Sequence, residues 1–163
     1  MSVDNLLFLA GVKHKLEAYK RFLRDIGDNY KQNLLLQYID TTDEDTASIT
    51  EDIPMLKNNI LDLAKSIQKE FGEDVLEIVE RNITYTERLA ILASGKCYVK
   101  STKRESFSLD IYEFLNLKIL MNDTKEICYI LSELSGVTSS LSAAIKINPF
   151  DVIFNLIIYR SSL

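Results

Sequence analysis

Hydrophobic and polar residues alternate in blocks along the chain, and the first blocks predict a strand, a turn and a helix. An apolar run over residues 3–9 stops just before Gly11. Beyond this glycine, apolar residues recur at intervals of three and four, which is the spacing of one helical face. The residues on this face are Leu16, Tyr19, Leu23 and Ile26.

The alternation continues to the end of the chain. Ser48 with Glu51, and Thr84 with Glu87, have the spacing of capping boxes and mark two helix starts. Strands that alternate with helices through short polar turns predict an α/β fold with a parallel sheet covered on both faces. The predicted strands are 33–39, 74–79, 97–99, 127–131 and 143–147, and the predicted helices are 53–71, 84–95, 107–121 and a segment after Asn148 and Pro149.

The chain is expected to form one domain over residues 1–163. With 163 residues, 47% of them hydrophobic, it is long enough to bury a substantial core. No repeat, low-complexity tract or proline-rich linker divides it.

The charge pattern argues against nucleic acid as a partner. The formal net charge is −5, the sequence pI is about 5.0, and the 19 lysines and arginines are scattered. An acidic stretch over residues 40–52 contains no glycine that could form the turn of a calcium loop, so it predicts a solvated loop. No metal site is expected there.

The cysteines and the histidine also provide no metal or catalytic site. Cys97 and Cys128 lie in apolar strands at a spacing typical of neither zinc sites nor secreted disulfide frameworks, which favours free thiols in a reducing cytoplasm. His14 is the only histidine and is expected to be a solvated helix residue. The apolar runs 6–10 and 152–159 are too short for a signal segment or a membrane span, so no membrane association is expected.

Phosphate-binding glycine motifs are absent. The five glycines form neither G-x-G-x-x-G nor G-x-x-x-x-G-K-[ST], which excludes these two routes to dinucleotide and P-loop chemistry. By itself, Gly11 predicts only a strand-to-helix turn. Residues 101–106, with three hydroxyls and three charges, predict a solvated start of a helix, although open α/β sheets place their ligands at such turns.

Three segments carry a resemblance to a known family. "GVKHKLEAYKRFL" (11–23), "RLAILASGKCYVKSTKRESFSLDIYEF" (88–114) and "LSELSGVTSSLSAAIKINPFD" (131–151) are similar, in order, to the donor-binding half of trehalose-6-phosphate synthases, glycosyltransferase family 20. The resemblance implies a Rossmann-like single lobe of the two-lobed GT-B fold. It also implies the family reaction, glucosyl transfer from UDP-glucose to glucose 6-phosphate, with no cofactor.

The resemblance assigns remnant donor-binding positions. Glu113 matches the glutamate that holds the ribose hydroxyls, and Leu109 falls where backbone amides at a helix start meet the donor phosphates. However, Asn5 and Ala10 stand where the family has an arginine and a lysine that face the phosphates. The full set of expected donor-nucleotide positions is Gly11, Arg104, Glu105, Ser108, Leu109 and Glu113.

The sequence therefore predicts a domain of trehalose synthesis with a weakened phosphate grip and with no catalytic residues of its own. It would be non-catalytic alone, regulatory or scaffolding, and would bind UDP-glucose weakly if at all. One alternative is the donor half of a working synthase whose acceptor lobe is elsewhere, with Lys13 or Lys103 replacing the lost cations. Another is an interaction module without ligand.

The expected partners are other trehalose synthase subunits or an acceptor lobe. Residues 152–159 are apolar on all sides of a predicted helix, which favours self-association or a partner through this segment.

Overall fold

Two three-stranded parallel sheets adjoin at the centre of the structure. The computed structural model describes residues 1–27, 34–41, 53–124 and 127–151. One sheet has the order β1-β2-β3 and the other has the order β4-β5-β6. The strands are β1 (Ser2–Asn5), β2 (Leu35–Asp40), β3 (Leu76–Glu80), β4 (Cys97–Lys100), β5 (Cys128–Ser132) and β6 (Ile145–Ile147).

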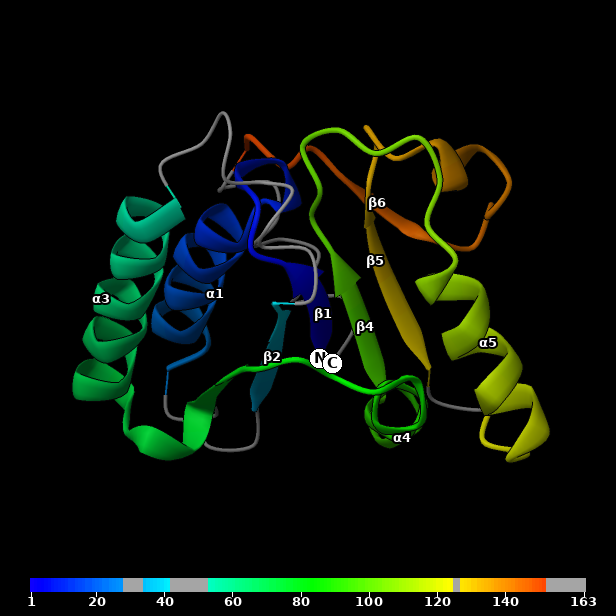
Figure 1. Cartoon of the computed structure of the whole chain (residues 1–163), viewed down its shortest axis with the longest axis horizontal. Helices are drawn as coiled ribbons and strands as arrows, with labels where there is room; N and C mark the ends of the chain where they lie inside the picture. Colours follow the sequence, from blue (N-terminus) through cyan, green and yellow to red (C-terminus); the bar gives the residue numbers. More distant parts are fainter. Residues whose placement is uncertain (28–33, 42–52, 125–126, 152–163) are drawn as a thin grey trace.

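Strand β1 lies beside β4, so the six strands follow the order β3-β2-β1-β4-β5-β6 (Figure 1). The Val99 amide donates to the Met1 carbonyl at 2.9 Å. The Met1 amino group donates to the Cys97 carbonyl at 2.6 Å. The strand order reverses between β1 and β4, and ligands of open α/β sheets bind outside the carboxyl ends of the strands at such a point.

In the part of the chain that the structure describes, four helices pack on the sheet in pairs, one pair on each face (Figure 1). Short 3-10 turns, η1 (Phe8–Ala10), η3 (Glu73–Val75) and η4 (Gly136–Ser139), connect some of the elements. The helices α1 and α3 form one pair, and α4 and α5 form the other. Their bounds are α1 (Val12–Ile26), α3 (Ile53–Phe71), α4 (Tyr85–Ser94) and α5 (Asp110–Leu120).

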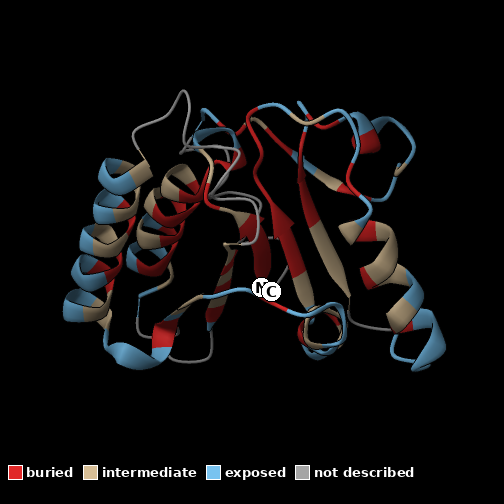
Figure 2. Cartoon of the chain, in the orientation of Figure 1, coloured by how far each residue is buried: buried red, intermediate tan, exposed pale blue. Residues whose placement is uncertain are grey.

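Alternate residues of each strand point to opposite faces, and the clusters of buried hydrophobic residues follow this alternation. In β2, Leu35 and Ile39 join the core beneath α1 and α3, whereas Leu36 and Tyr38 pack on the opposite side with α4 and α5. Figure 2 shows the buried residues concentrated on the strands and on the helix sides that face them. The predicted parallel sheet with helices on both faces is confirmed.

Two predicted boundaries were wrong by three residues or more. Strand β1 ends at Asn5, not at residue 9, because the Leu7 amide turns back to the Asn5 carbonyl at 2.8 Å and η1 follows. Helix α5 begins at Asp110, not at residue 107, and the segment before it is held against the start of η4. In that segment, the carbonyl of Glu105 accepts from the Gly136 amide at 3.1 Å.

Other predictions fall partly outside the described residues. The capping box of Thr84 and Glu87 is present at the start of α4, with both of its hydrogen bonds. The Ser48 and Glu51 pair, most of the acidic stretch and the segment 152–159 lie outside the described residues.

Candidate functional site

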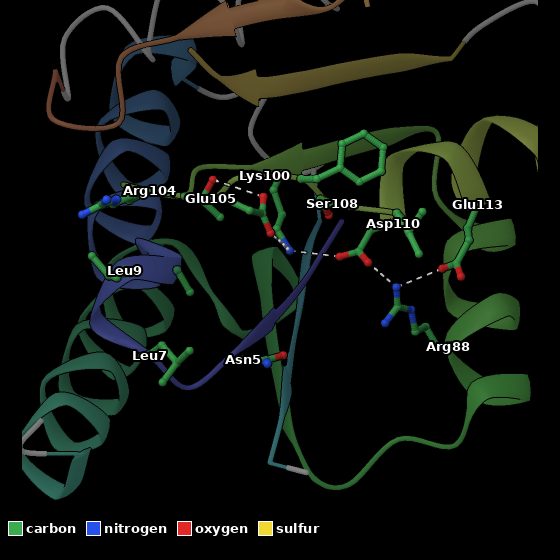
Figure 3. A pocket seen from close by; sticks show the side chains of 14 residues that line it. Asn5, Leu7, Leu9, Arg88, Lys100, Arg104, Glu105, Ser108, Asp110 and Glu113 are labelled. Atoms are coloured by element: carbon green, nitrogen blue, oxygen red, sulfur yellow. Dashed lines mark hydrogen bonds and ion pairs between the residues drawn. The ribbon is translucent and has the colours of Figure 1, made fainter. Parts of the chain in front are cut away.

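A cavity of about 530 Å³ opens where the loops after β1 and β4 separate (Figure 3). This is the place that the reversed strand order favours for a ligand. One wall comes from the loop after β1, and the floor and opposite wall come from β4, the loop after it and the start of α5. The lining includes Asn5, Ala10, Arg88, Lys100, Arg104, Glu105, Phe107, Ser108, Leu109, Asp110 and Glu113.

A close approach of two loops shapes the first wall. Gly11 adopts a left-handed conformation, with φ of 74°, between η1 and α1. A Cβ atom on Gly11 would lie 2.2 Å from the carbonyl oxygen of Ser101, so only glycine fits there. Next to this contact, the Lys103 amide donates to the Leu9 carbonyl at 2.7 Å.

Lys100 lies at the floor of the cavity, at the carboxyl end of β4. Its ammonium donates to the Asp110 carboxylate at 2.9 Å and lies 3.7 Å from Glu105 and 3.8 Å from Asp4. Only 8% of the residue is exposed. Burial would lower the pKa of Lys100, but the surrounding carboxylates outweigh burial and raise this pKa. Lys100 therefore places a positive charge at the floor of the cavity.

Asp110 is the first residue of α5, and several donors bind its carboxylate. One oxygen accepts from Arg88, and the other accepts from Lys100 at 2.9 Å and from the Tyr98 hydroxyl at 3.2 Å. Burial would raise the pKa of Asp110, but the charges of Lys100 and Arg88 hold this pKa below its ordinary value. Asp110 is therefore an ionised carboxylate inside the cavity.

Arg88 connects α4 to α5. Besides Asp110, its guanidinium donates to the Glu113 carboxylate at 2.9 Å, so both acidic partners come from the first turn of α5. Figure 3 shows Lys100, Asp110, Arg88 and Glu113 in one row of contacts. The ribose-contacting role expected of Glu113 thus falls on a side chain that is already engaged in an ion pair.

A buried ion pair lies below the cavity floor. Lys15 of α1 donates to Asp4 of β1, and both side chains are almost completely buried. The Asp4 carboxylate also accepts from the Ser2 hydroxyl at 2.7 Å and from the Gln37 side-chain amide at 3.0 Å. Burial would raise the pKa of Asp4, but Lys15 and Lys100 hold this pKa below its ordinary value.

The structure brings five of the six expected site residues to this cavity. Arg104, Glu105, Ser108, Leu109 and Glu113 line it. Gly11 does not line it; it shapes the adjacent loop contact and borders a separate small recess. Asn5 and Ala10 also line the cavity, so the two substituted positions face the same space.

Neither lysine proposed as a replacement cation lines this cavity. Lys103 is buried and its ammonium lies 3.4 Å from the centre of the Phe8 ring. Lys13 lies 3.9 Å from Glu17 on the surface of α1. The cations of the cavity are Arg88, Lys100 and Arg104.

The expectation of a solvated helix start at residues 101–106 was wrong. Ser101, Thr102 and Lys103 are buried, because the loop after β4 packs against the loop after β1. Within residues 101–106, the exposed residues are Arg104 and Ser106. The side chain of Arg104 extends away from the row of ion pairs (Figure 3). Within the described part of the chain, no ion pair engages it.

The other titratable residues of interest are only partly exposed. Cys97 and Cys128 are free and half-buried, and they are register partners on the neighbouring strands β4 and β5. Burial lowers the pKa of His14, which is also half-buried rather than fully solvated. The described residues contain no group of three or more metal-binding side chains, and none of their helices is long and apolar enough to cross a membrane.

Sequence reasoning missed Arg88, Lys100 and Asp110. For Lys100 and Asp110 a signal was available, because they end a buried strand and begin the following helix, where α/β folds place ligand contacts. Nothing in the local sequence of α4 separates Arg88 from an ordinary exposed helix residue. Its role is visible only once α4 packs beside α5.

The sequence model of glycosyltransferase family 20 matches residues 1–155. The chain is 30% identical over 155 residues to the 56 kDa subunit of the UDP-forming alpha,alpha-trehalose-phosphate synthase of Saccharomyces cerevisiae, covering 93% of this chain and 30% of that protein. It is 28% identical to a putative 100 kDa subunit of Schizosaccharomyces pombe, covering 92% of this chain and 16% of that protein. The chain therefore spans less than a third of the length of these curated relatives.

Solved structures share the fold. An alpha,alpha-trehalose-phosphate synthase from Burkholderia xenovorans, in complex with glucose-6-phosphate, matches with a TM-score of 0.87 at 18% identity, over 100% of this chain and 35% of that one. The N-terminal domain of a Candida albicans trehalose-6-phosphate phosphatase matches with a TM-score of 0.84 at 20% identity, over 99% of this chain and 33% of that one. The fold is thus that of one lobe of these larger proteins.

Proposed function

Because the chain belongs to glycosyltransferase family 20, we propose that it serves trehalose synthesis as a regulatory or scaffolding donor-lobe domain that transfers no glucose by itself. The relatives act as UDP-forming trehalose-phosphate synthases according to their names. The proposed role differs from theirs because the cavity of this chain differs in its charged residues. The proposal also places the chain in the cytoplasm, beside other subunits of a trehalose synthase complex or an acceptor lobe.

The observation that carries this proposal is the uncharged wall of the cavity. Asn5 and Ala10 line it at the two positions where the resemblance expects an arginine and a lysine. A leaving UDP group gains negative charge during transfer, and positioned cations are a main source of its stabilisation. Losing one such donor typically costs a factor of about 10² to 10³ in rate, so the loss of two leaves little catalysis.

Titration calorimetry with UDP and with UDP-glucose tests this proposal. The expected result is no binding in the micromolar range, because each missing charge-assisted hydrogen bond is worth about 1.5–3 kcal/mol. A glucosyl-transfer assay with glucose 6-phosphate as acceptor should show no product. Micromolar affinity for UDP-glucose, or transfer by this chain alone, would overturn the proposal.

A second candidate is the donor half of a working synthase. The presence of Lys100 and Arg104 in the cavity favours it, since both could approach a diphosphate from the side of β4. Adding a separately produced acceptor lobe of the same family distinguishes the two. Transfer that appears only in the mixture, and that disappears in an Arg104→Gln and Lys100→Met chain, would establish this candidate.

A further inference from the structure

The first turn of α5 combines three features that attract an anion. The positive end of a helix macrodipole lies there, and no side-chain cap occupies its free amides. The guanidinium of Arg88 and the ammonium of Lys100 point to the same place (Figure 3). By general physical chemistry, such an arrangement binds a phosphate or a carboxylate.

The chain fills this position with its own carboxylate. Asp110 accepts from Arg88 through one oxygen, and from Lys100 and Tyr98 through the other. Both cations of the position are thereby neutralised by Asp110 together with Glu105 and Glu113. An incoming phosphate would have to displace a bound carboxylate and then remain beside its negative charge.

We propose that Asp110 is a built-in occupant of this anion position, and that it makes the cavity a site for an uncharged sugar rather than for a nucleoside diphosphate. The inference rests on the proposed function, in which UDP binding is lost, and it names what the same cavity accepts instead. Asp110 thus acts as a specificity-determining residue.

The charge balance of the cavity supports an uncharged ligand. Three cationic and three anionic side chains line it, so their formal charges cancel. Sugars present hydroxyl groups that both donate and accept hydrogen bonds, which suits a wall of carboxylates, guanidinium groups and the buried Ser108. The six charged side chains are Arg88, Lys100, Arg104, Glu105, Asp110 and Glu113.

The rim supports a ring-shaped ligand. Phe107 lines the cavity, is 55% exposed, and stacks on Tyr112 with 5.6 Å between ring centres. The stack holds one aromatic ring at the opening, where the apolar face of a sugar ring can pack against it. A cavity of about 530 Å³ has the size of ordinary small-molecule sites and has room for a mono- or disaccharide.

The test compares matched pairs of ligands and variants. Glucose, trehalose, glucose 6-phosphate and UDP are titrated into the parent chain, into Asp110→Asn and into Phe107→Ala. The parent should bind at least one of the two uncharged sugars in the millimolar range and bind UDP more weakly. Asp110→Asn keeps the shape and removes the charge, and should bind UDP about tenfold or more tightly than the parent does. Asp62→Asn, on the exposed surface of α3, is the charge-matched control and should leave all four affinities unchanged.

Phe107→Ala provides an independent arm, because an exposed side chain can be removed without opening the core. It should weaken sugar binding at least threefold while the thermal unfolding temperature stays at the parent value. Absence of any sugar binding in the parent, or unchanged UDP affinity in a folded Asp110→Asn chain, would overturn this inference. Neither result touches the proposed function, which fails only if the parent itself binds UDP-glucose tightly or transfers glucose.

Discussion

The Lys100 ammonium lies 2.9 Å from the Asp110 carboxylate, and this contact joins the charges of the core to those of the cavity. Below it, Lys100 lies 3.8 Å from Asp4, which is bound to the buried Lys15. Above it, Asp110 accepts from Arg88. Charges of opposite sign therefore alternate from α1 through the sheet to α5, and each is compensated by its neighbours. The resulting row is Lys15, Asp4, Lys100, Asp110, Arg88 and Glu113.

The buried end of this row should be essential for stability. Lys15→Met removes one partner of a buried pair and leaves Asp4 with only the more distant Lys100 as a cation. The free energy of unfolding in urea should fall by about 3–5 kcal/mol, the usual cost of an uncompensated buried charge. Lys65→Met, at an exposed position of α3, should change it by less than about 0.5 kcal/mol. If Lys15→Met lowered the free energy of unfolding no more than Lys65→Met does, Lys15 would not be needed to balance the charge of Asp4.

Acid should destabilise the fold through Asp4 and Asp110. In the folded chain, the pKa values of both carboxyls lie below their ordinary value of 3.8. Their contribution to stability is therefore complete above that value and is lost as the pH falls below about 4 toward the folded-state pKa. Urea unfolding between about pH 6 and pH 3 should show this decline.

The Asp110→Asn chain tests the assignment of that decline. It should be less stable than the parent at neutral pH and should lose less stability on acidification, because one of the two linked carboxyls is absent. The control is Asp62→Asn, whose exposed carboxylate engages in no ion pair within the described part of the chain. If both variants follow the parent curve, other groups dominate the acid response.

Gly11 should tolerate no side chain, because two independent costs coincide there. Its φ of 74° is unfavourable for other residues, and the added Cβ would lie 2.2 Å from the Ser101 carbonyl oxygen. Gly72 has a positive φ of 102°, but no atom lies within 4 Å of an added Cβ. Gly11→Ala should therefore cost about 2–3 kcal/mol more of unfolding free energy than Gly72→Ala. Equal losses would mean that the two loops separate easily.

The fold was predictable because its signals are local. The capping box of Thr84 and Glu87 marks the start of α4, and the helical spacing around Leu16 marks α1. The boundaries near residues 5 and 107 were missed for two reasons: a local turn from the Leu7 amide to the Asn5 carbonyl ends β1, and the segment before α5 is bound at Glu105 to the distant Gly136. Hydrophobic patterns locate elements well, but turns and tertiary contacts decide where those elements stop.

The site was predictable only in part, for a related reason. The resemblance located Glu105 and Glu113 at the cavity, but not their ion-pair partners. Lys15 illustrates why: a lysine within a helix is ordinarily exposed, and its burial becomes intelligible only when β1 brings Asp4 beside it. Arg88 likewise becomes part of the site only through the packing of α4 against α5.

The segment 152–159 lies outside the described residues, and the prediction for it rests on the sequence. Its apolar residues would surround a helix on all sides, and such a helix needs cover from more than one direction. Sedimentation of the purified chain at tens of micromolar should therefore show self-association, and Ile157→Asp should reduce it. A monomer that Ile157→Asp leaves unchanged would remove the argument for a partner at this segment.

Two substitutions in the uncharged wall of the cavity should create a diphosphate-binding site. Asn5→Arg together with Ala10→Lys places two cations on a wall that faces the floor at Lys100. Each restored charge-assisted hydrogen bond is worth about 1.5–3 kcal/mol, so UDP affinity should rise by at least about tenfold.

Asn58→Arg with Asn59→Lys adds the same charge to exposed positions of α3 and should raise UDP affinity little at ordinary salt. Titration of the parent and both double variants measures this gain, and adding Asp110→Asn should enlarge it because the competing carboxylate is removed. Equal affinities for the two double variants would mean that the loop after β1 no longer presents residues 5 and 10 to a donor phosphate. Glucosyl transfer by the converted chain should stay undetectable, because these substitutions act on UDP binding and on no contact with an acceptor.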